Sequence, residues 1–394
     1  MTVSPVESAL AQFPTPFYLF DAEILSAQIS HIRALLPAHV ELCYAMKANA
    51  FITDKAASEV ERIEACSPGE VRICQACGVP DAKIVISGVH KDAELMRELV
   101  TEHPAIARYT VESIAQFDLL EQVAREAGRR ISILIRLTSG NQFGVDAVVA
   151  KDLAARCTEN GPLELAGIQL FSGTQKTSLK RMKKELDAAD RLIGEIEAEC
   201  GMSVAEFEYG PGLPVLYFDE DNVAESEQDD IARGLGELLQ SMSFQGRIAI
   251  ELGRAIAASC GTYATRVVDA KSNGGNNYAI VDGGKHQIAY YGNAMAMKQP
   301  PCRMIPERAG SAEPWNICGS LCTVTDILVK QLPISDLHIG DAVVFERAGA
   351  YCATEGIALF LCRDLPRVIV RDHDGELHLV RDRIETYPLN NPAR

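Results

Sequence analysis

Short apolar runs alternate with longer amphipathic stretches through the first 250 residues of the chain. The runs at 83–87, 131–137 and 163–171 have the length of strands, and their largely apolar composition suits strands buried on both faces of a parallel sheet. The stretches at 114–127 and 179–200 repeat apolar residues at helical spacing. Such an alternation predicts a parallel sheet, and nearly eight units predict an α/β fold with a closed (β/α)8 barrel of the TIM type.

The alternation of strand-like and helix-like stretches ends after about residue 254. Strand-like runs then follow one another without long helices between them, and turn signals such as Asn273-Gly274-Gly275 separate them. We therefore expect a mostly antiparallel β domain after the barrel. The predicted domains are residues 22–255 for the barrel, and residues 1–21 together with 256–394 for the β domain. The acidic stretch 219–230 is expected to be a solvated surface loop.

Charge and composition narrow the classes of function. The 38 basic residues against 54 acidic ones give a formal charge of −16, which argues against a nucleic-acid partner or an anionic membrane surface. No stretch approaches the roughly 20 apolar residues of a membrane span, and residues 1–20 do not resemble a secretory signal. Twelve scattered cysteines without such a signal suggest reduced thiols and a cytoplasmic protein. Cys74 and Cys77 form an isolated C-x-x-C pair, so we expect no metal site.

Lys47 directly follows the apolar run 42–46. Burying an ammonium group costs several kcal/mol unless its pKa falls or the amine reacts. A desolvated lysine loses its proton readily and becomes a nucleophile that can bind a carbonyl cofactor covalently. The simpler interpretation is that Lys47 only reaches solvent just past the end of a strand.

Other polar residues and glycine turns follow the remaining predicted strands. Active sites of such barrels lie at the carboxyl ends of the strands. Glycine turns and hydroxyl groups suit a phosphate, because backbone N–H groups can approach it closely. Together with the lysine, this set indicates pyridoxal phosphate. The residues are Lys47, Glu64 with Ser67, Arg136, Ser172-Gly173-Thr174, Gly210-Pro211-Gly212, and Glu251 with Arg254.

Five motifs resemble those of the fold-type III pyridoxal-phosphate decarboxylases, the group of diaminopimelate, ornithine and arginine decarboxylases. The resemblance runs from Thr15 to about Glu355. The motifs are Y-A-M-K-A-N around Lys47, E-A-C-S-P-G-E at 64–70, E-L-G-R at 251–254, C-G-S-L-C-T-V-T-D at 318–326, and G-A-Y at 349–351.

The resemblance implies a role for each matching residue. Lys47 would carry the cofactor as a Schiff base, Glu251 would bind the pyridine nitrogen, and Arg254 and Tyr351 would bind the phosphate. Cys322 would act as the general acid that protonates the substrate carbon after decarboxylation, from the neighbouring subunit of a homodimer with shared active sites. We expect further cofactor contacts from Glu64, Arg136, Phe171, Thr174, Gly210 and Gly212, and substrate contacts from Thr323, Asp326 and Tyr351. A small packed core residue is the alternative interpretation of Cys322.

Several positions depart from the family pattern. Phe171 stands where the family has a histidine that stacks on the pyridine ring, and Pro211 interrupts the usual triple-glycine turn. Thr323 replaces the glutamate of the diaminopimelate enzymes, and residues 282–297 lack the arginine expected for a distal carboxylate. These changes argue against diaminopimelate as the substrate. Phe171, together with Gly-Thr-Gln at 173–175, Asp-Gly-Gly at 282–284 and Leu-Cys-Thr at 321–323, resembles the carrier-protein-linked amino-acyl decarboxylases, so the amino-acid substrate could arrive free or bound to a carrier protein.

Two other functions fit the same architecture. An amino-acid racemase also places a lysine after the first strand, but it pairs the pyridine nitrogen with arginine rather than with a carboxylate such as Glu251. A non-catalytic pyridoxal-phosphate protein would lack a β domain, which residues 262–383 are expected to form. We therefore favour an α-decarboxylase.

Overall fold

A computed structural model describes residues 3–218, 225–290 and 297–393 of the chain. The chain divides into two compact units. One comprises residues 28–215 and 224–256, and the other comprises residues 1–27, 216–223 and 257–394. None of the described helices is long and apolar enough to cross a membrane.

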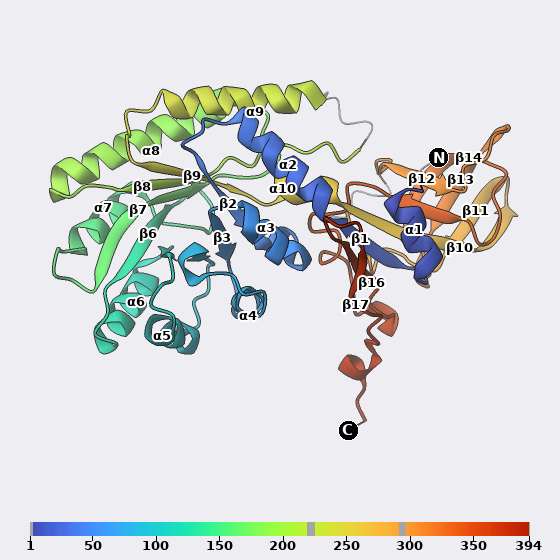
Figure 1. Ribbon diagram of the computed structural model, residues 1–394, viewed down its shortest axis with the longest axis horizontal. Coiled ribbons are helices and arrows are strands. Elements are labelled where there is room, and N and C mark those ends of the chain that lie inside the picture. Colours follow the sequence, from blue (N-terminus) through green and yellow to red (C-terminus); the bar gives the residue numbers. More distant parts are fainter. Residues whose placement is uncertain (1–2, 219–224, 291–296, 394) are drawn as a thin grey trace. The chain divides into compact units, whose positions relative to one another are not determined.

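The unit of residues 28–215 and 224–256 contains a closed barrel of parallel strands, which confirms the predicted (β/α)8 architecture (Figure 1). Among the described residues, eight strands pair in chain order, and the last pairs with the first. They are β2 (Glu41–Ala45), β3 (Arg62–Ala65), β4 (Ile84–Ile86), β5 (Arg108–Val111), β6 (Ile131–Leu137), β7 (Leu163–Phe171), β8 (Glu206–Gly210) and β9 (Arg247–Leu252).

Helices surround these strands, and several of them begin at a polar cap directly encoded in the sequence. Ser178 accepts a hydrogen bond from the Arg181 N–H at the start of α8, and the helix ends at Gly201, whose φ of 65° is left-handed. Ser67, Asp92, Ser113 and Asp146 cap four others in the same way. The helices are α2 (Ala22–Leu35), α3 (Thr53–Glu59), α4 (Pro68–Ala76), α5 (Ala93–Glu102), α6 (Ile114–Glu126), α7 (Ala147–Arg156), α8 (Leu179–Cys200), α9 (Glu225–Gln240) and α10 (Arg254–Ala257).

A column of buried polar side chains links three barrel strands from their amino ends toward their carboxyl ends. Arg62 and Glu64 share one face of β3, and Glu206 and Glu208 share one face of β8, because side chains alternate along a strand. Arg62 Nη2 lies 2.9 Å from Glu206 Oε2, and Gln169 of β7 donates a 2.7 Å hydrogen bond to Glu208. Polar side chains therefore extend from the amino ends of these strands to Glu208 inside the barrel, and Cys43, Val85, Leu134 and Ala166 of barrel strands form a separate buried apolar cluster.

The other unit is built on a mixed, mostly antiparallel sheet, as predicted for the β domain. Its central strand β1 pairs antiparallel with β10 and parallel with β16. The strands are β1 (Phe17–Asp21), β10 (Gly261–Asn273), β11 (Asn276–Val281), β12 (Cys302–Ile305), β13 (Ala312–Cys318), β14 (Ile327–Ser335), β15 (Ala342–Phe345), β16 (Arg367–Arg371) and β17 (Leu377–Arg381).

Three elements of the β unit, and the segment that leads into helix α9, differ from the sequence-based expectation. Strands β12 and β17 and helix α1 (Pro5–Gln12) were not predicted. Val6 and Ala9 of α1 pack into a buried apolar cluster with residues of the sheet, which accounts for the helix. The acidic stretch 219–230 was expected to be a loop, but the chain is helical from Glu225 onward, and 219–224 lie outside the described residues.

Candidate active site

Lys47 lies at the carboxyl end of the barrel between two carboxylates. Strand β2 ends at Ala45, and Lys47 occupies the 3-10 turn Met46–Ala48 that follows. Its Nζ is 2.5 Å from Glu64 Oε2 and 3.3 Å from Glu251 Oε1. The Lys47 side chain is 38% exposed, whereas those of Glu64 and Glu251 are 2% and 6% exposed. The two acids are thus fixed inside the barrel, and the amine remains accessible to a ligand.

The two carboxylates control the protonation of Lys47. Burial acts to lower the pKa of the ammonium group, whereas the charges of Glu64 and Glu251 act to raise it. The effect of the two charges is larger, so the pKa of Lys47 lies well above the usual range. The sequence-based expectation that desolvation alone frees this amine of its proton is therefore wrong. Burial acts to raise the pKa of Glu64, but Lys47 holds it below the usual range. Burial and the Glu64 charge raise the pKa of Glu251.

Two glycine turns meet at the ends of β7 and β8. Phe171 pairs in register with Gly210, and a Cβ on Gly210 would lie 2.4 Å from Cδ2 of the Phe171 ring. A Cβ on Gly212 would lie 2.0 Å from the carbonyl oxygen of Gly173, and Gly212 has a φ of 60°. The glycines are therefore required for the two turns to touch. Thr174 follows in the same loop, and its side chain is exposed.

Arg136, which was predicted to contact the cofactor, pairs with an acid in this structure. Its Nη1 lies 3.1 Å from Glu112 Oε1, and both side chains are nearly buried. The guanidinium carbon of Arg136 also lies 4.9 Å from the centre of the Phe143 ring. Arg254 begins helix α10 directly after β9, and it is partly buried.

Lys91 is a buried cation near this site that the sequence analysis missed. Its Nζ donates to the Gly88 carbonyl oxygen at 3.2 Å and to Thr110 Oγ1 at 3.4 Å. Burial lowers its pKa to about 8, although the charge of Glu112 opposes that shift. Two sequence positions could have revealed this site. Lys91 lies four residues after the predicted strand 83–87, and its neighbour Glu112 directly follows the predicted strand 105–111.

Lys176 forms a second network that was missed, at the ends of β7 and β8. Its Nζ donates to Ser172 Oγ at 2.7 Å, to Glu185 Oε2 at 2.7 Å and to the Tyr209 hydroxyl at 3.2 Å. Its backbone N–H donates to the Gly212 carbonyl oxygen at 2.8 Å. Lys176 therefore helps to fix both glycine turns.

The remaining predicted residues belong to the β unit. Cys322 is exposed, and Thr323 and Tyr351 are partly buried. Asp326 is 2% exposed, and its two carboxylate oxygens accept hydrogen bonds from the backbone N–H groups of Lys285 and Leu321, each at 2.8 Å. These bonds favour a role for Asp326 in holding the loop that carries Cys322 and Thr323.

The sequence matches the family "Pyridoxal-dependent decarboxylase, pyridoxal binding domain" over residues 22–258, which is more than half of the chain. The chain belongs to this family. It is a pyridoxal-phosphate-dependent amino-acid decarboxylase, which confirms the predicted enzyme class, cofactor and family.

Curated relatives of this decarboxylase act on different substrates. Diaminopimelate decarboxylase of Pseudomonas aeruginosa is 28% identical over 86% of this chain and 84% of its own length. The L-glutamyl-[BtrI acyl-carrier protein] decarboxylase of Niallia circulans is 24% identical over 94% of this chain and 91% of its own length. The family is therefore established, while the substrate differs among its members.

Solved structures share the fold of this decarboxylase. Diaminopimelate decarboxylase from Helicobacter pylori, complexed with L-lysine, superposes with a TM-score of 0.84 at 23% identity, covering 98% of each chain. Lysine/ornithine decarboxylase from Vibrio vulnificus, complexed with cadaverine, gives a TM-score of 0.81 at 19% identity, covering 93% of this chain and 97% of that one.

The residues at the barrel end fit pyridoxal phosphate. An accessible amine can bind the aldehyde, and the buried Glu251 beside it can face a ring nitrogen. The contact between Gly173 and Gly212 leaves backbone without side chains beside it, which suits a phosphate. All of these groups lie on the same unit of the decarboxylase.

Proposed function

We propose that this enzyme removes the α-carboxylate of an amino acid with pyridoxal phosphate held covalently on Lys47. The position of Lys47 Nζ between Glu64 and Glu251 carries the proposal, because it joins a reactive amine to a carboxylate suited to a pyridine nitrogen. Bound pyridoxal phosphate supplies the electron sink that allows the carboxylate to leave as carbon dioxide. We keep residues 22–255 as the proposed limits of the domain that holds the cofactor.

The chain's own residues would position the cofactor and move protons around it. Glu64 holds the Lys47 ammonium, and a cationic ring nitrogen beside Glu251 would lower the pKa of Glu251 and keep it ionised. Phe171 can stack on the ring but offers it no hydrogen bond. The proposed cofactor contacts are Lys47, Glu64, Arg136, Phe171, Thr174, Gly210, Gly212, Glu251, Arg254 and Tyr351.

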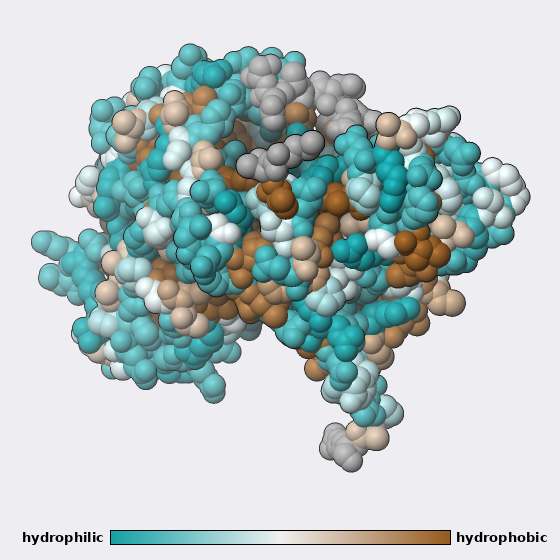
Figure 2. Space-filling view, turned by 45° about the vertical axis from the view of Figure 1, so that its right-hand side comes forward, coloured by the Kyte–Doolittle hydropathy of each residue, from teal (hydrophilic) through white to brown (hydrophobic). Residues whose placement is uncertain are grey.

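Residues of the β unit would complete the site in a homodimer with shared active sites. Cys322 is the proposed general acid, and Thr323, Asp326 and Tyr351 are the proposed substrate contacts. Exposed apolar side chains support a subunit interface on this unit, since Val324 is 92% exposed two residues from Cys322. Figure 2 shows a largely hydrophilic surface that is broken by hydrophobic patches. Besides Val324, the large apolar side chains exposed on the β unit include Ile357, Leu359, Phe360, Leu361, Tyr387 and Leu389.

We infer that the substrate is an amino acid tethered through its distal end to an acidic carrier protein. Thr323 and the absence of arginine from 282–297 remove the charged residues that the family pattern places at a free distal end, and Lys285 and His286 are the basic residues left in that stretch. A relative of similar length decarboxylates a glutamyl group on an acyl-carrier protein. A tethered substrate would need no charged pocket for its distal end, which agrees with both observations.

Exposed basic residues at the start of helix α8 support a docking surface for such a carrier protein. Lys180, Arg181, Lys183 and Lys184 are exposed in its first two turns, where the positive end of the helix dipole disfavours cations. This end of α8 follows the loop after β7, so it lies at the carboxyl end of the barrel. A cavity of about 580 Å³ beside it is lined by apolar residues and by charged residues of both signs, which are Arg181, Lys184, Arg191, Asp146, Glu185 and Glu195. Arg181 pairs with Glu185 and Lys183 with Asp187, so Lys180 and Lys184 are the basic residues of these turns that contrast most with the −16 charge of the chain.

We also propose that the enzyme is cytoplasmic, since its twelve cysteines are all free in the structure, as is usual for proteins of a reducing compartment.

Carbon dioxide release tests this function. Purified holoenzyme should release carbon dioxide from one member of a panel of free and carrier-bound amino acids, and Lys47→Ala should abolish the release. Borohydride should fix the cofactor on the Lys47 peptide. Labelling of a different lysine, or racemisation without carbon dioxide, would contradict the proposal. Equal rates on the free and carrier-bound forms of the amino acid would contradict the carrier-tethered substrate but not the decarboxylase activity.

A further inference from the structure

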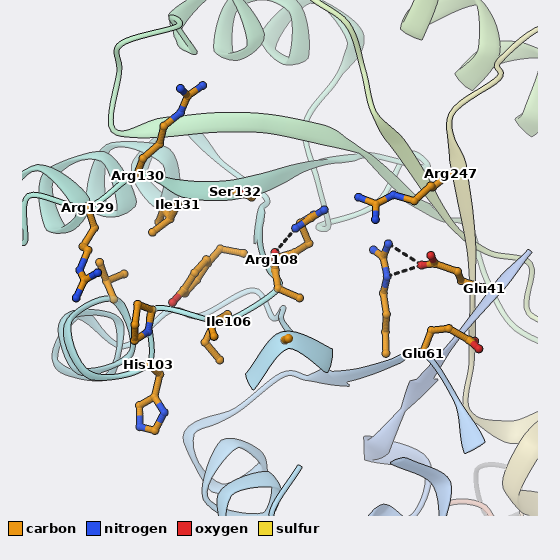
Figure 3. Close-up of a pocket in the computed structure, with 17 residues that line it drawn as sticks. Glu41, Glu61, His103, Ile106, Arg108, Arg129, Arg130, Ile131, Ser132 and Arg247 are labelled. Carbon is orange, nitrogen blue, oxygen red and sulfur yellow. Dashed lines mark hydrogen bonds and ion pairs between the residues drawn. The ribbon is translucent and has the colours of Figure 1, made fainter. Parts of the chain in front are cut away.

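A second cavity lies at the opposite end of the barrel from Lys47. It has a volume of about 420 Å³, and the side chains that line it are drawn in Figure 3. Glu41, Arg62, Arg108, Ile131 and Arg247 each line it, and each is the first residue of a barrel strand. The cavity therefore opens at the amino ends of the strands, away from the proposed catalytic residues.

The lining of this cavity is strongly cationic. Five arginines contribute to it, against the two carboxylates of Glu41 and Glu61, although the whole chain carries a formal charge of −16. A local excess of this sign within an acidic protein concentrates anions at the cavity. The arginines are Arg62, Arg108, Arg129, Arg130 and Arg247.

Three of the arginines converge on a single buried carboxylate. Arg62, Arg108 and Arg247 each place Nη2 within 3.2 Å of Glu206 Oε2, at 2.9, 3.0 and 3.2 Å. Glu41 also accepts a hydrogen bond from Arg62 Nε, at 3.0 Å. Figure 3 shows the Arg108 and Arg247 side chains extending toward each other. Glu208 also lies 3.7 Å from Arg62, so Glu41, Glu206 and Glu208 together face these three guanidinium groups, and the positive excess at the cavity comes from Arg129 and Arg130.

Donors at the cavity remain available to a ligand. The Arg247 side chain is 56% exposed and makes one contact with Glu206, so most of its N–H groups are free to bind elsewhere. Arg129 is exposed, and its side chain makes no hydrogen bond or ion pair with the described part of the chain, whereas its backbone N–H donates to the Ala124 carbonyl oxygen at 2.9 Å. Arg62 and Arg108, by contrast, are largely occupied by internal partners. Internal contacts at the barrel end therefore explain the positions of Arg62 and Arg108, but not those of Arg247 and Arg129.

Tyr109 adds an independent observation. It lines the cavity, and its hydroxyl makes no hydrogen bond with another described residue. The hydroxyl is not one of the described polar atoms that are both buried and unpaired, so it reaches the open space of the cavity. It can therefore donate a hydrogen bond to a ligand oxygen there.

We propose that this cavity binds a small oxyanion, a molecule that carries phosphate or carboxylate groups, through Arg247, Arg129 and the Tyr109 hydroxyl. Guanidinium groups bind both kinds of oxyanion in a bidentate manner. The cavity wall also contains the apolar residues Val100, Pro104 and Ile106, which would contact an uncharged part of the same molecule. The site is separate from the proposed cofactor site, which lies at the other end of the strands.

Calorimetric titration of the holoenzyme with pyrophosphate and with citrate tests the proposal. The filled cofactor site keeps either probe from binding there. At least one probe should bind with one site per chain, and stronger binding of pyrophosphate would favour a phosphate ester, whereas stronger binding of citrate would favour a polycarboxylate. Salt should weaken the binding.

Matched variants locate the site. Arg247→Ala and Arg129→Ala should each weaken binding about tenfold or more, and Tyr109→Phe should weaken it several-fold while preserving the ring. Arg233→Ala, which changes an exposed arginine of α9 in the same unit, should leave binding unchanged. Tyr109→Phe and Arg129→Ala alter few internal contacts, so they remain informative if Arg247→Ala fails to fold. The proposal fails if neither probe binds at millimolar concentration, or if these variants bind like the wild type.

Discussion

Lys47 and Glu64 form an ion pair between neighbouring strand ends of the barrel, with 2.5 Å between Nζ and Oε2. The pKa of Glu64 is lowered, so the pair stabilises the fold above the usual glutamate pKa, and this contribution is lost as the pH falls through the lowered value. The pKa of Lys47 is raised, so the contribution persists below the usual lysine pKa and is lost only as the pH rises past the raised value. The amine is consequently protonated across the neutral range before the cofactor binds.

Replacing Glu64 should ease the loss of that proton. In Glu64→Gln, the pKa of Lys47 should fall by about 1–3 units, because a carboxylate next to the ammonium is removed. The midpoint of the pH dependence of cofactor attachment should move to lower pH by a similar amount, as measured by visible absorbance. Glu94→Gln makes the same charge change at an exposed site of α5 and should leave the midpoint unmoved. An unchanged midpoint in Glu64→Gln would mean that the ion pair does not control attachment.

Gly212→Ala should disrupt the paired glycine turns. The new Cβ would lie 2.0 Å from the Gly173 carbonyl oxygen, and the φ of 60° strains any residue with a side chain. We expect the affinity for pyridoxal phosphate to fall about tenfold or more, which fluorescence titration would measure. Gly194→Ala is a suitable control, because a Cβ at this position of α8 meets nothing within 4 Å. If Gly212→Ala binds the cofactor normally, the turns do not form the phosphate site.

Glu251→Gln should separate cofactor binding from turnover. The amide preserves the shape of the side chain but cannot carry the negative charge that keeps a ring nitrogen protonated. Cofactor should still bind, and kcat should fall by about 10²–10⁴-fold, the usual range for the loss of a proton-controlling group. A variant with nearly normal kcat would show that another group controls the pyridine nitrogen.

Free meso-diaminopimelate should be a poor substrate. Thr323 offers no charge to a distal amine, and residues 282–297 contain no arginine for a distal carboxylate. We expect kcat/KM for diaminopimelate to be at least about 100-fold below that for the best member of the panel, because an unpaired buried charge costs several kcal/mol. Product analysis for lysine would measure it. Efficient lysine formation would direct attention to Lys285 or His286 as the distal contact.

Mixed dimers test whether the active site is shared. Lys47 and Cys322 belong to different units of the chain, and each of Lys47→Ala and Cys322→Ala should be inactive alone. In a dimer with shared sites, a mixed pair has one site with both changes and one site with neither. Random mixing should therefore restore about a quarter of wild-type activity, since half of the dimers are mixed. Activity no higher than that of the separate variants would place both residues of each site in one chain.

The regular part of the fold could be predicted because its signals are local. Buried parallel strands produce largely apolar runs such as 163–171. Helix α8 was predicted at its observed limits because Ser178 and Gly201 flank a clear helical pattern. Helix α1 carried an equally local signal, the capping box of Ser4 and Glu7, which the sequence analysis overlooked. Strands β12 and β17 are short and partly exposed, so their hydrophobic pattern is weak.

Sequence position alone indicated some of the residues that meet at the end of the barrel, and their roles toward the cofactor stay predictions. Lys47, Glu64 and Glu251 stand at strand ends, and the closed barrel brings them together. The ion pair of Arg136 with Glu112 and the contacts of Lys176 join strands that are distant in the sequence, so spacing alone could not reveal them. The raised pKa of Lys47 was missed for a related reason, because it depends on charges from two other strands.

The polar column inside the barrel means that its two ends are electrically coupled. Arg62 Nη1 lies 3.7 Å from Glu208 Oε2, and the charge of Glu208 acts to raise the pKa of Glu251. A substitution at the amino end of the strands, such as one at Arg62, therefore changes the field at Glu251 without altering any atom that touches the cofactor. For protein engineering, we therefore expect substitutions at the amino ends of the strands to shift the acidity of Glu251 without replacing any residue beside Lys47.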